Sequence, residues 1–294
     1  MIKKILFIPL SNIGDAVMTI PTLLYLKKIY PFAKFDLICD QRSVEIFQYF
    51  PSINEIFIRD KSAVFIDQLI FFKKIRKNNY DLAIDLKTDI LLWFVRAKSK
   101  IFKSNNKSLH SVEKHFLSCE SDFNKIPDPK IFIPINIENK LSKLLQLKRG
   151  KTIAIALGAN SVHKIWPIAN YVKLLKLLRN KFKNIILVGS KNDVMQALSF
   201  EKLYDQKIIN LCGALTLLES AAAIKKSDFF IGNDSGLGHI ASAVGTKSFT
   251  IFGDGQPNRY RPWGIKSNWY QNIEKDINLI TADTIFKELK KILN

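Results

Sequence analysis

The sequence is poor in cysteine and has no apolar run long enough to cross a membrane. Its three cysteines, Cys39, Cys119 and Cys212, are far apart and lack metal or redox spacing, so we expect them to be buried apolar side chains. The longest apolar candidate, at 3–10, is shorter than the ~18 residues of a membrane span and lacks the cleavage site of a signal peptide. These absences predict a cytoplasmic protein.

Acidic residues and arginine are also scarce. The 294 residues include 26 Asp and Glu against 45 Lys and Arg, a formal net charge of +19, and eight of the 45 are arginine. A positive surface attracts nucleotide phosphates or an acidic membrane face, but a surface selected to hold phosphates is expected to use more arginine. Codon bias therefore stays an equal explanation of the charge. Nucleic acid is a less favoured partner, because no basic-aromatic recognition motif is present.

Several catalytic motifs are missing. The chain has neither G-x-x-x-x-G-K-[ST] nor G-x-S-x-G, which argues against a P-loop NTPase and an α/β-hydrolase. No two aspartates have the D-x-D spacing of many metal-dependent sugar transferases, and no His, Cys and Glu cluster has metal spacing. We therefore expect no cofactor and no required metal, so that helix ends and lysine neutralise any bound diphosphate.

What is present is an alternation of short apolar runs with helical patterns, which predicts parallel sheets covered on both faces. The alternation lapses over 121–150, where three prolines indicate a connection, and restarts at Lys151. We expect an α/β protein with two Rossmann-like domains, 1–148 and 149–294, facing an interdomain cleft at the strand carboxyl ends. The last helix, 282–293, is a candidate to pack back on the N-terminal domain.

The stretch FFIGNDSGLGHIASAVG, residues 229–245, passes from an apolar strand through polar and glycine residues into a helix. Backbone amides in the first turn of that helix, at its positive end, suit a phosphate, and Gly236 and Gly238 would let a ligand approach closely. The alternative is ordinary capping, because strand-to-helix turns favour the same residues. The candidate ligand residues are Asn233, Asp234, Ser235, Gly236 and His239.

A second turn, ALGANSVHKIWP, follows the first strand of the second half. Its residues Gly158, Ala159 and Asn160 form a loop before Lys164. The single ammonium of Lys164 suits a phosphate oxygen on a leaving group, although a lysine in this chain is equally explained as a solvated residue. Asp193 follows the next strand and either accepts hydrogen bonds from ribose hydroxyls or caps a helix.

A third turn, SNIGDAVMTIP, follows the first strand of the chain. Gly14 and Asp15 open a helix there, so Asp15 is expected to point towards the cleft from the opposite domain. Its carboxylate either stabilises the helix dipole or acts as a general base. An NAD-dependent oxidoreductase is disfavoured, because IPLSNIGDAV lacks G-x-G-x-x-G.

Together these stretches resemble the heptosyltransferases of glycosyltransferase family nine. The resemblance keeps its order along the chain through ILFIPLSNIGDAVMTIP, YDLAIDLK, LGANSVHKIWP, NLCGALTLLESAAAI, GNDSGLGHIASAVGT and FGDGQPNRYRPWG. It implies a GT-B fold, with the donor held by the C-terminal domain and the acceptor by the N-terminal one. It also implies inverting, metal-independent transfer of a heptose from ADP-heptose to a Kdo–lipid A or heptosylated core acceptor at the inner membrane face.

The resemblance also implies a role for each matching residue. Asp15 is similar to the family's general base, Lys164 to the lysine at the donor diphosphate or sugar, and Asp193 to the acidic contact with ribose. Asp234 corresponds to the residue that touches the transferred sugar. The remaining donor residues are Gly158, Ala159, Asn160, Asn233, Ser235, Gly236 and His239, and the acceptor residues are Gly14 and Lys87. The stretch 98–115 falls in the family's variable acceptor region and does not identify the acceptor.

Two alternatives and one further partner stay open. A transferase of the same fold with another nucleotide-sugar donor is the nearer alternative, and a non-catalytic nucleotide-sugar-binding protein is the other. Asp15 and Lys164 together argue against the second, because a protein without turnover has no need of the base. The helix at 64–78 and the lysines of 98–107 either contact an anionic membrane surface peripherally or form a core-packing helix with a solvated basic face.

Overall fold

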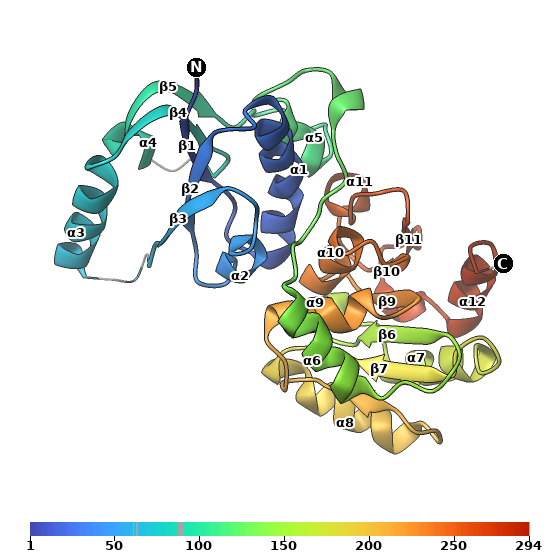
Figure 1. The fold of residues 1–294 in the computed structure, drawn as a ribbon. Helices are drawn as coiled ribbons and strands as arrows, with labels where there is room; N and C mark the ends of the chain where they lie inside the picture. The colour runs from blue at the N-terminus through green and yellow to red at the C-terminus, as the bar shows by residue number, and fades with distance from the viewer. Residues whose placement is uncertain (61, 63, 88–90, 294) are drawn as a thin grey trace. The chain divides into compact units, whose positions relative to one another are not determined.

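The computed structural model describes residues 1–60, 62, 64–87 and 91–293. Its contacts divide the chain into two units, Met1–Phe132 and Ile133–Asn294 (Figure 1). Each unit contains one sheet in which every recorded pair of strands is parallel, with helices between the strands, so the predicted α/β class is confirmed. Within the described ranges, no helix combines the length and apolar character that crossing a membrane requires.

The first unit has a five-stranded sheet in the order β3-β2-β1-β4-β5. Its strands are β1 (Lys4–Ile8), β2 (Lys34–Cys39), β3 (Ile53–Ile58), β4 (Asn79–Asp85) and β5 (Arg96–Phe102). Its helices are α1 (Ile13–Ile29), α2 (Val44–Phe47), α3 (Phe65–Arg76), α4 (Leu91–Phe94) and α5 (Ser111–Phe116), and a 3-10 turn covers Phe123–Lys125. Strand β5 and helix α5 cover the two ends of the stretch 98–115, where no element was predicted.

The two faces of this sheet are covered by different helices. Helices α1 and α5 pack against each other, whereas Ile75 of α3 and Leu91 of α4 join a separate apolar cluster with Leu6 and Ile8 of β1. Figure 1 shows α3 and α4 on one side of the sheet and α1 and α2 on the other. The arrangement is the two-faced covering that the strand–helix alternation predicts.

A buried polar cluster joins four strands of this sheet. The carboxylate of Asp36 on β2 is fully buried, accepts hydrogen bonds from the Tyr80 hydroxyl at 3.0 Å and from Asn54 Nδ2 at 2.8 Å, and pairs with Lys4 Nζ at 3.1 Å. Burial and the neighbouring Asp36 charge raise the pKa of Tyr80. A different register or order of these strands would leave the buried Asp36 carboxylate without its partners, which is strongly destabilising. The cluster therefore favours the observed arrangement of strands.

The second unit has a six-stranded sheet in the order β11-β10-β9-β6-β7-β8. Its strands are β6 (Thr152–Ala156), β7 (Asn184–Leu187), β8 (Ile209–Asn210), β9 (Phe229–Asn233), β10 (Ser248–Phe252) and β11 (Ser267–Gln271). Its helices are α6 (Ile135–Leu145), α7 (Ile168–Leu177), α8 (Val194–Leu203), α9 (Leu217–Lys225), α10 (Gly236–Ala243), α11 (Pro257–Tyr260) and α12 (Ala282–Lys290). Short 3-10 turns cover Val162–Lys164, Lys191–Asp193 and Ile277–Leu279.

Helix α6 lies inside the stretch that the sequence indicated as an irregular connection. Its buried residues Leu141 and Leu145 are one helical turn apart, and the helix packs against α9. An ion pair of 2.7 Å joins Glu138 to Lys225 across this contact. The division between the units falls at 132/133, before α6, which is inside the predicted connection but earlier than the predicted boundary at 148/149.

The final helix, α12, is capped by Thr281, whose hydroxyl accepts a hydrogen bond from the Thr284 amide at 3.2 Å. Ala282, Ile285 and Leu289 are fully buried in the core of the second unit, where α12 packs against α7. The apolar face of this helix is thus used within its own unit. Packing of the helix on the N-terminal domain stays a prediction.

In both sheets, the order in which successive strands are added reverses at the same topological place. Counted from the first strand of each unit, the order is 3-2-1-4-5 in the first and 3-2-1-4-5-6 in the second, so the switch points lie between β1 and β4 and between β6 and β9. Open α/β sheets bind ligands outside the strand carboxyl ends at this switch point. The turns at Asp15, Lys87, Lys164 and Asp234 follow these four strands.

Candidate functional site

Asn233 ends β9 and is fully buried at the switch point of the second unit. Its Oδ1 accepts hydrogen bonds from the Trp166 amide at 3.0 Å and from the Tyr171 hydroxyl at 2.9 Å. Its Nδ2 donates to the carbonyl of Leu157 at 2.7 Å. The side chain therefore ties the end of β9 to the loop after β6, and its contribution to the site is to position these two loops.

Lys164 and Asp234 form an ion pair, with Nζ and Oδ2 2.6 Å apart. Lys164 ends the turn after β6, and Trp166 anchors the following residues by donating from Nε1 to the Ile280 carbonyl at 2.7 Å. The Lys164 side chain keeps 33% of its surface exposed and that of Asp234 keeps 12%. A lysine ammonium has three N–H donors, so one fixed by Asp234 leaves two for a ligand. The sequence had predicted separate ligand contacts for these residues, and the structure pairs them.

Ser235 is the N-cap residue of α10, but its side chain does not cap the helix. Its backbone is extended, and its Oγ is buried without a hydrogen-bond partner in the part of the chain that the structure describes. The amides of Gly236 and Leu237 lie in the first turn, where amides have no carbonyl partner within the helix. The helix end therefore combines a buried hydroxyl, first-turn amides and a partial positive charge.

Gly238 and His239 lie deeper in α10 and are both buried. A Cβ on Gly238 would lie 3.2 Å from Thr250 Oγ1 and 3.4 Å from Pro262 Cγ, so the close approach at this glycine is to β10 and the following loop. This packing is reason enough for a glycine at position 238, and the approach of a ligand to its backbone stays a prediction. Contact of His239 with phosphates stays a prediction.

Asp193 caps a short turn rather than helix α8, and its contact with ribose stays a prediction. Its Oδ2 accepts hydrogen bonds from the Ser190 amide and hydroxyl, both at 2.7 Å, and closes a capping box around the turn Lys191–Asp193. A Cβ on Gly158 would lie 1.7 Å from Asp193 Oδ1, so only glycine fits against this carboxylate. Asp193, which follows β7, thus packs directly against the loop after β6. Beyond Gly158, Ala159 is half-buried and Asn160 exposed.

A further loop, which the sequence analysis did not assign to the site, follows β10. A Cβ on Gly255 would lie 2.8 Å from Asp234 Oδ2, so this loop passes directly beside the ion pair. Gln271 holds it in place by donating from Nε2 to the carbonyls of Gly253 at 2.6 Å and Gly255 at 2.8 Å. The change from strand to glycine and polar residues in FGDGQ could have indicated this loop. Gln271 lies on β11, which the sequence did not predict.

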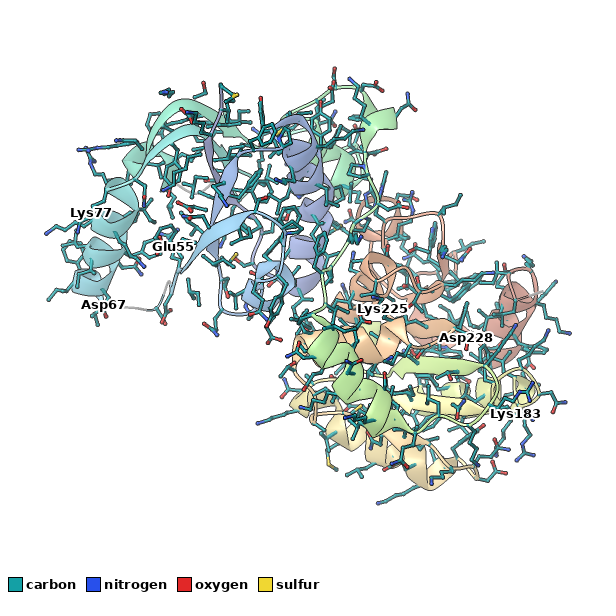
Figure 2. The ribbon with its side chains drawn as sticks, viewed as in Figure 1. Glu55, Asp67, Lys77, Lys183, Lys225 and Asp228 are labelled. Carbon is teal, nitrogen blue, oxygen red and sulfur yellow. The ribbon has the colours of Figure 1, made fainter. Side chains whose placement is uncertain are left out.

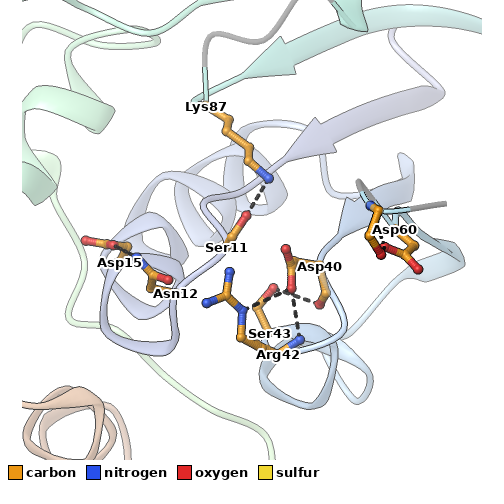
Figure 3. Close-up of polar contacts among 9 residues, drawn as sticks. Ser11, Asn12, Asp15, Asp40, Arg42, Ser43, Asp60 and Lys87 are labelled. Atoms are coloured by element: carbon orange, nitrogen blue, oxygen red, sulfur yellow. Dashed lines mark hydrogen bonds and ion pairs between the residues drawn. The ribbon is translucent and has the colours of Figure 1, made fainter. Parts of the chain in front are cut away.

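The first unit presents a looser set of polar side chains at its own switch point (Figure 3). Asp15 is half-buried in the first turn of α1, beside Gly14, and its Oδ2 accepts a hydrogen bond from Asn12 Nδ2 at 3.0 Å. Lys87 Nζ donates to Ser11 Oγ and so joins the loops after β1 and β4. Figure 3 shows Asp15 with Asn12, apart from the Lys87–Ser11 pair.

Two charged residues after β2 lie at the same edge of the sheet. Arg42 donates from Nε to Asp40 Oδ1 at 3.3 Å. Partial burial acts to raise the pKa of Asp40, but the hydrogen bonds and charge of Arg42, together with the charge of Lys87, hold it below its ordinary value. Across residues 1–60, 62, 64–87 and 91–293, no three His, Cys, Asp or Glu side chains are grouped to hold a metal ion, and metal independence stays a prediction.

The sequence and the fold of the chain are similar to those of known glycosyltransferases. The sequence profile of glycosyltransferase family 9 (heptosyltransferase) matches residues 69–288. Lipopolysaccharide heptosyltransferase 3 of Escherichia coli K12 is 27% identical over 298 residues, which cover 89% of this chain and 86% of the relative. Lipopolysaccharide heptosyltransferase 1 of Campylobacter coli is 28% identical over 290 residues, which cover 85% and 84%. The solved structure of E. coli ADP-heptose LPS heptosyltransferase II matches with a TM-score of 0.83 at 20% identity, over 99% of this chain and 98% of that one.

Proposed function

The chain belongs to glycosyltransferase family 9 (heptosyltransferase), and from this premise we propose that it transfers a heptose from ADP-heptose to an acceptor of the lipopolysaccharide core. The chain is a glycosyltransferase with the GT-B fold that the sequence resemblance implied. The names of its relatives support the donor and the kind of acceptor, since they include an ADP-heptose enzyme and two lipopolysaccharide heptosyltransferases. These relatives are numbered 1, II and 3, so both a Kdo–lipid A and a heptosylated acceptor stay candidates.

The Lys164–Asp234 pair beside the N-terminus of α10 is the observation that carries this proposal. The Lys164 ammonium and the first-turn amides of α10 supply positive charge for a diphosphate without a metal ion. The buried hydroxyl of Ser235, unpartnered among the described atoms, can donate to a phosphate oxygen. Asp234 then faces the transferred sugar, and Asp193 the ribose.

In the proposed reaction, Asp15 is the general base. Its carboxylate takes the proton of the acceptor hydroxyl while that oxygen bonds to the anomeric carbon, and the bond from this carbon to the β-phosphate oxygen breaks. The configuration at carbon inverts and ADP leaves with the bonding electrons. Lys164 and the α10 amides stabilise the charge that grows on the departing diphosphate. Asp234 stabilises the positive charge on the sugar, and Gly14 and Lys87 contact the acceptor.

Nucleotide selection and product analysis test the proposal in two steps. Thermal shifts are compared for ADP, UDP and GDP, and the product of ADP-heptose with Kdo–lipid A or its heptosylated form is then weighed by mass spectrometry. We expect ADP to give the largest shift and one acceptor to gain the mass of one heptose. Preference for UDP or GDP would assign another donor, whereas ADP-heptose binding without any transfer would assign a non-catalytic binding protein.

A further inference from the structure

Helix α3 exposes most of its apolar side chains. Its inward face consists of residues spaced three or four apart, of which Ile75 is buried and Phe71 and Phe72 are partly buried against the core. Its first two turns carry large apolar side chains that face solvent. They are Phe65 at 75% exposure, Ile66 at 67%, Leu69 at 43% and Ile70 at 59%. The alternative of a core-packing helix with a solvated basic face accounts for the second half of α3, but not for these four exposed apolar side chains.

The exposed apolar surface continues from α3 to α4 and to the end of β5. The rings of Phe72 and Phe94 are 5.0 Å apart, and those of Trp93 and Phe102 are 6.3 Å apart. Trp93 is 74% exposed, and Phe94 and Phe102 are each more than 40% exposed. We call this set the α3–α4 surface, and it consists of Phe65, Ile66, Ile70, Trp93, Phe94 and Phe102. Single exposed apolar residues are normal, but a contiguous set marks an interaction site.

Basic side chains adjoin the α3–α4 surface. Lys73 and Lys77 continue the outward face of α3 beyond Ile66 and Ile70 at helical spacing and form no ion pair with any residue that the structure describes. Lys74 is used within the unit, since it pairs with Glu55 at 2.8 Å. Figure 2 shows Asp67 and Lys77 at opposite ends of α3 and Glu55 beside the helix. The edge strand β5 adds the exposed Arg96 and Lys100, whereas its exposed Lys98 pairs with Asp81 at 2.8 Å.

We propose that the α3–α4 surface docks on an anionic lipid bilayer. Aromatic and aliphatic side chains enter the boundary between head groups and acyl chains, while lysines extend to the lipid phosphates. The net charge of +19 favours an anionic membrane over a neutral one. Acidic side chains also adjoin the surface. Asp67 is exposed on α3 and Asp60 is exposed just before it, whereas Glu55 and Asp81 are paired with Lys74 and Lys98.

The surface also lies where it suits an acceptor carried by a lipid. Phe102 is in register with Asp85 at the carboxyl end of β4, and Asp85 Oδ1 accepts a hydrogen bond from the Lys87 amide at 2.7 Å. The apolar surface thus adjoins the loop to which the proposed function assigns acceptor binding. Only this link rests on the proposed function, because docking on lipid alone needs neither donor nor acceptor.

Vesicle co-sedimentation tests the docking. The wild-type chain is expected to sediment with vesicles of phosphatidylethanolamine and phosphatidylglycerol and to stay in solution with phosphatidylcholine vesicles. Ile66→Ser with Ile70→Ser, and separately Lys73→Glu with Lys77→Glu, should each lower partitioning at least about tenfold. Matched controls in the second unit, Ile265→Ser with Ile273→Ser and Lys176→Glu with Lys202→Glu, change exposed residues of the same types and should retain binding.

A measurement on the wild-type fold guards against variants that fail to fold. Brominated lipids should quench part of the tryptophan fluorescence, and Trp93→Phe should remove that part, because Trp93 is 74% exposed on the α3–α4 surface. Absence of quenching, or equal vesicle binding by test and control variants, overturns the proposal. A loss of dimer by light scattering in the Ile66→Ser with Ile70→Ser variant, without vesicle binding by the wild type, would instead assign this surface to a second copy.

The same variants separate this proposal from the proposed function. They should keep wild-type ADP affinity and wild-type transfer to a deacylated, water-soluble acceptor, because the substitutions leave the Lys164–Asp234 pair and Asp15 intact. Failure of the wild-type chain to use ADP-heptose would contradict the proposed function and leave vesicle docking standing. If the α3 variants lost transfer to the soluble acceptor while the control variants kept it, these residues would act in transfer itself. That result would contradict a role restricted to docking.

Discussion

The carboxyl edges of the two sheets stand at the same topological place and yet are built differently. In the second unit, the fully buried Asn233 fixes the loops that carry Lys164 and Asp234. In the first unit, Asp15 and Lys87 are held by the polar side chains of Asn12 and Ser11 near the surface. Groups fixed from the core suit one unvarying ligand such as a nucleoside diphosphate. Surface-held groups can change with the acceptor while the core stays the same.

The largest expected effect is the loss of transfer rate on substitution of Asp15. It separates the chemical step, assigned to the first unit, from ADP binding, assigned to the second. Asp15→Asn removes the proposed base but retains an oxygen for Asn12, so the transfer rate should fall ~10²- to 10⁴-fold while ADP affinity stays the same. Initial rates and calorimetric ADP titration measure the two quantities. Asn12→Ala is the control for local geometry and should cost far less. An unchanged rate in Asp15→Asn would limit Asp15 to stabilising the start of α1.

Asn233→Ala tests whether the second edge depends on its buried amide. The substitution leaves the Trp166 amide and the Leu157 carbonyl without their partner, which should lower the free energy of unfolding by about 2–4 kcal/mol and weaken ADP binding. Urea unfolding followed by tryptophan fluorescence measures the loss. Asn170→Ala, which removes one bond of 3.2 Å from a half-buried side chain, is the matched control and should cost less.

Lys164→Ala tests the charge at the same edge. Loss of a charge-assisted contact should weaken ADP binding about 10- to 100-fold, because the substitution also leaves the Asp234 carboxylate near the diphosphate. Lys173→Ala is the matched control, since Lys173 is likewise ion-paired, to Asp283, but on the exposed face of α7. Equal ADP affinity in both variants would contradict the diphosphate contact and limit Lys164 to its ion pair with Asp234.

A difference in acid sensitivity should sharpen the comparison. Burial lowers the pKa of His115 in α5, with help from nearby Lys114, to about 3 from 6.5. In the unfolded chain His115 binds a proton below pH 6.5, whereas in the folded chain it binds one only below about pH 3. The folded state therefore loses stability as the pH falls through this window. The loss at pH 5 should be about 2 kcal/mol. His115→Gln should flatten the pH dependence of melting of the first unit between pH 7 and 5, and an unaltered slope would contradict this account.

The smallest expected effect concerns the hydroxyl of Ser235. Ser235→Ala should weaken ADP binding about 2- to 10-fold. It should not lower stability, because the buried Oγ has no partner among the described residues to lose. Ser242→Ala, in the same helix, removes a hydroxyl that donates to the Trp263 carbonyl and should show the reverse pattern. Lower stability of Ser235→Ala with unchanged ADP affinity would contradict the phosphate contact.

The sequence predicted most of the buried elements and missed several exposed ones. Central strands such as β6 and β9 are buried at every position, so they stand out as apolar runs between helical patterns. The edge strands β5 and β11 carry mostly exposed or half-buried residues and show no such run. Helix α6 was missed because neighbouring prolines obscured the spacing of Leu141 and Leu145.

The place of the candidate residues at the strand carboxyl ends could be predicted, but most of their contacts within the protein could not. Polar residues at the strand ends indicated Asp15, Lys164, Asp193 and Asp234 before any fold was known. Capping by Asp193 was one of its two predicted alternatives, but the use of Asn233 within the protein was not predictable. The loop at Gly255 was missed because its approach to Asp234 depends on the order of β9 and β10.

The sequence by itself determined the alternation of strands and helices and the placing of polar residues at the strand carboxyl ends, because both follow from local patterns of apolar and turn-forming residues. Tertiary structure alone decided which of those residues meet. Lys164 and Asp234 are 70 positions apart and pair only because β6 and β9 are neighbours in the sheet. The exposure of the apolar half of α3 was decided in the same way, since a helical pattern does not state which face a neighbour will cover.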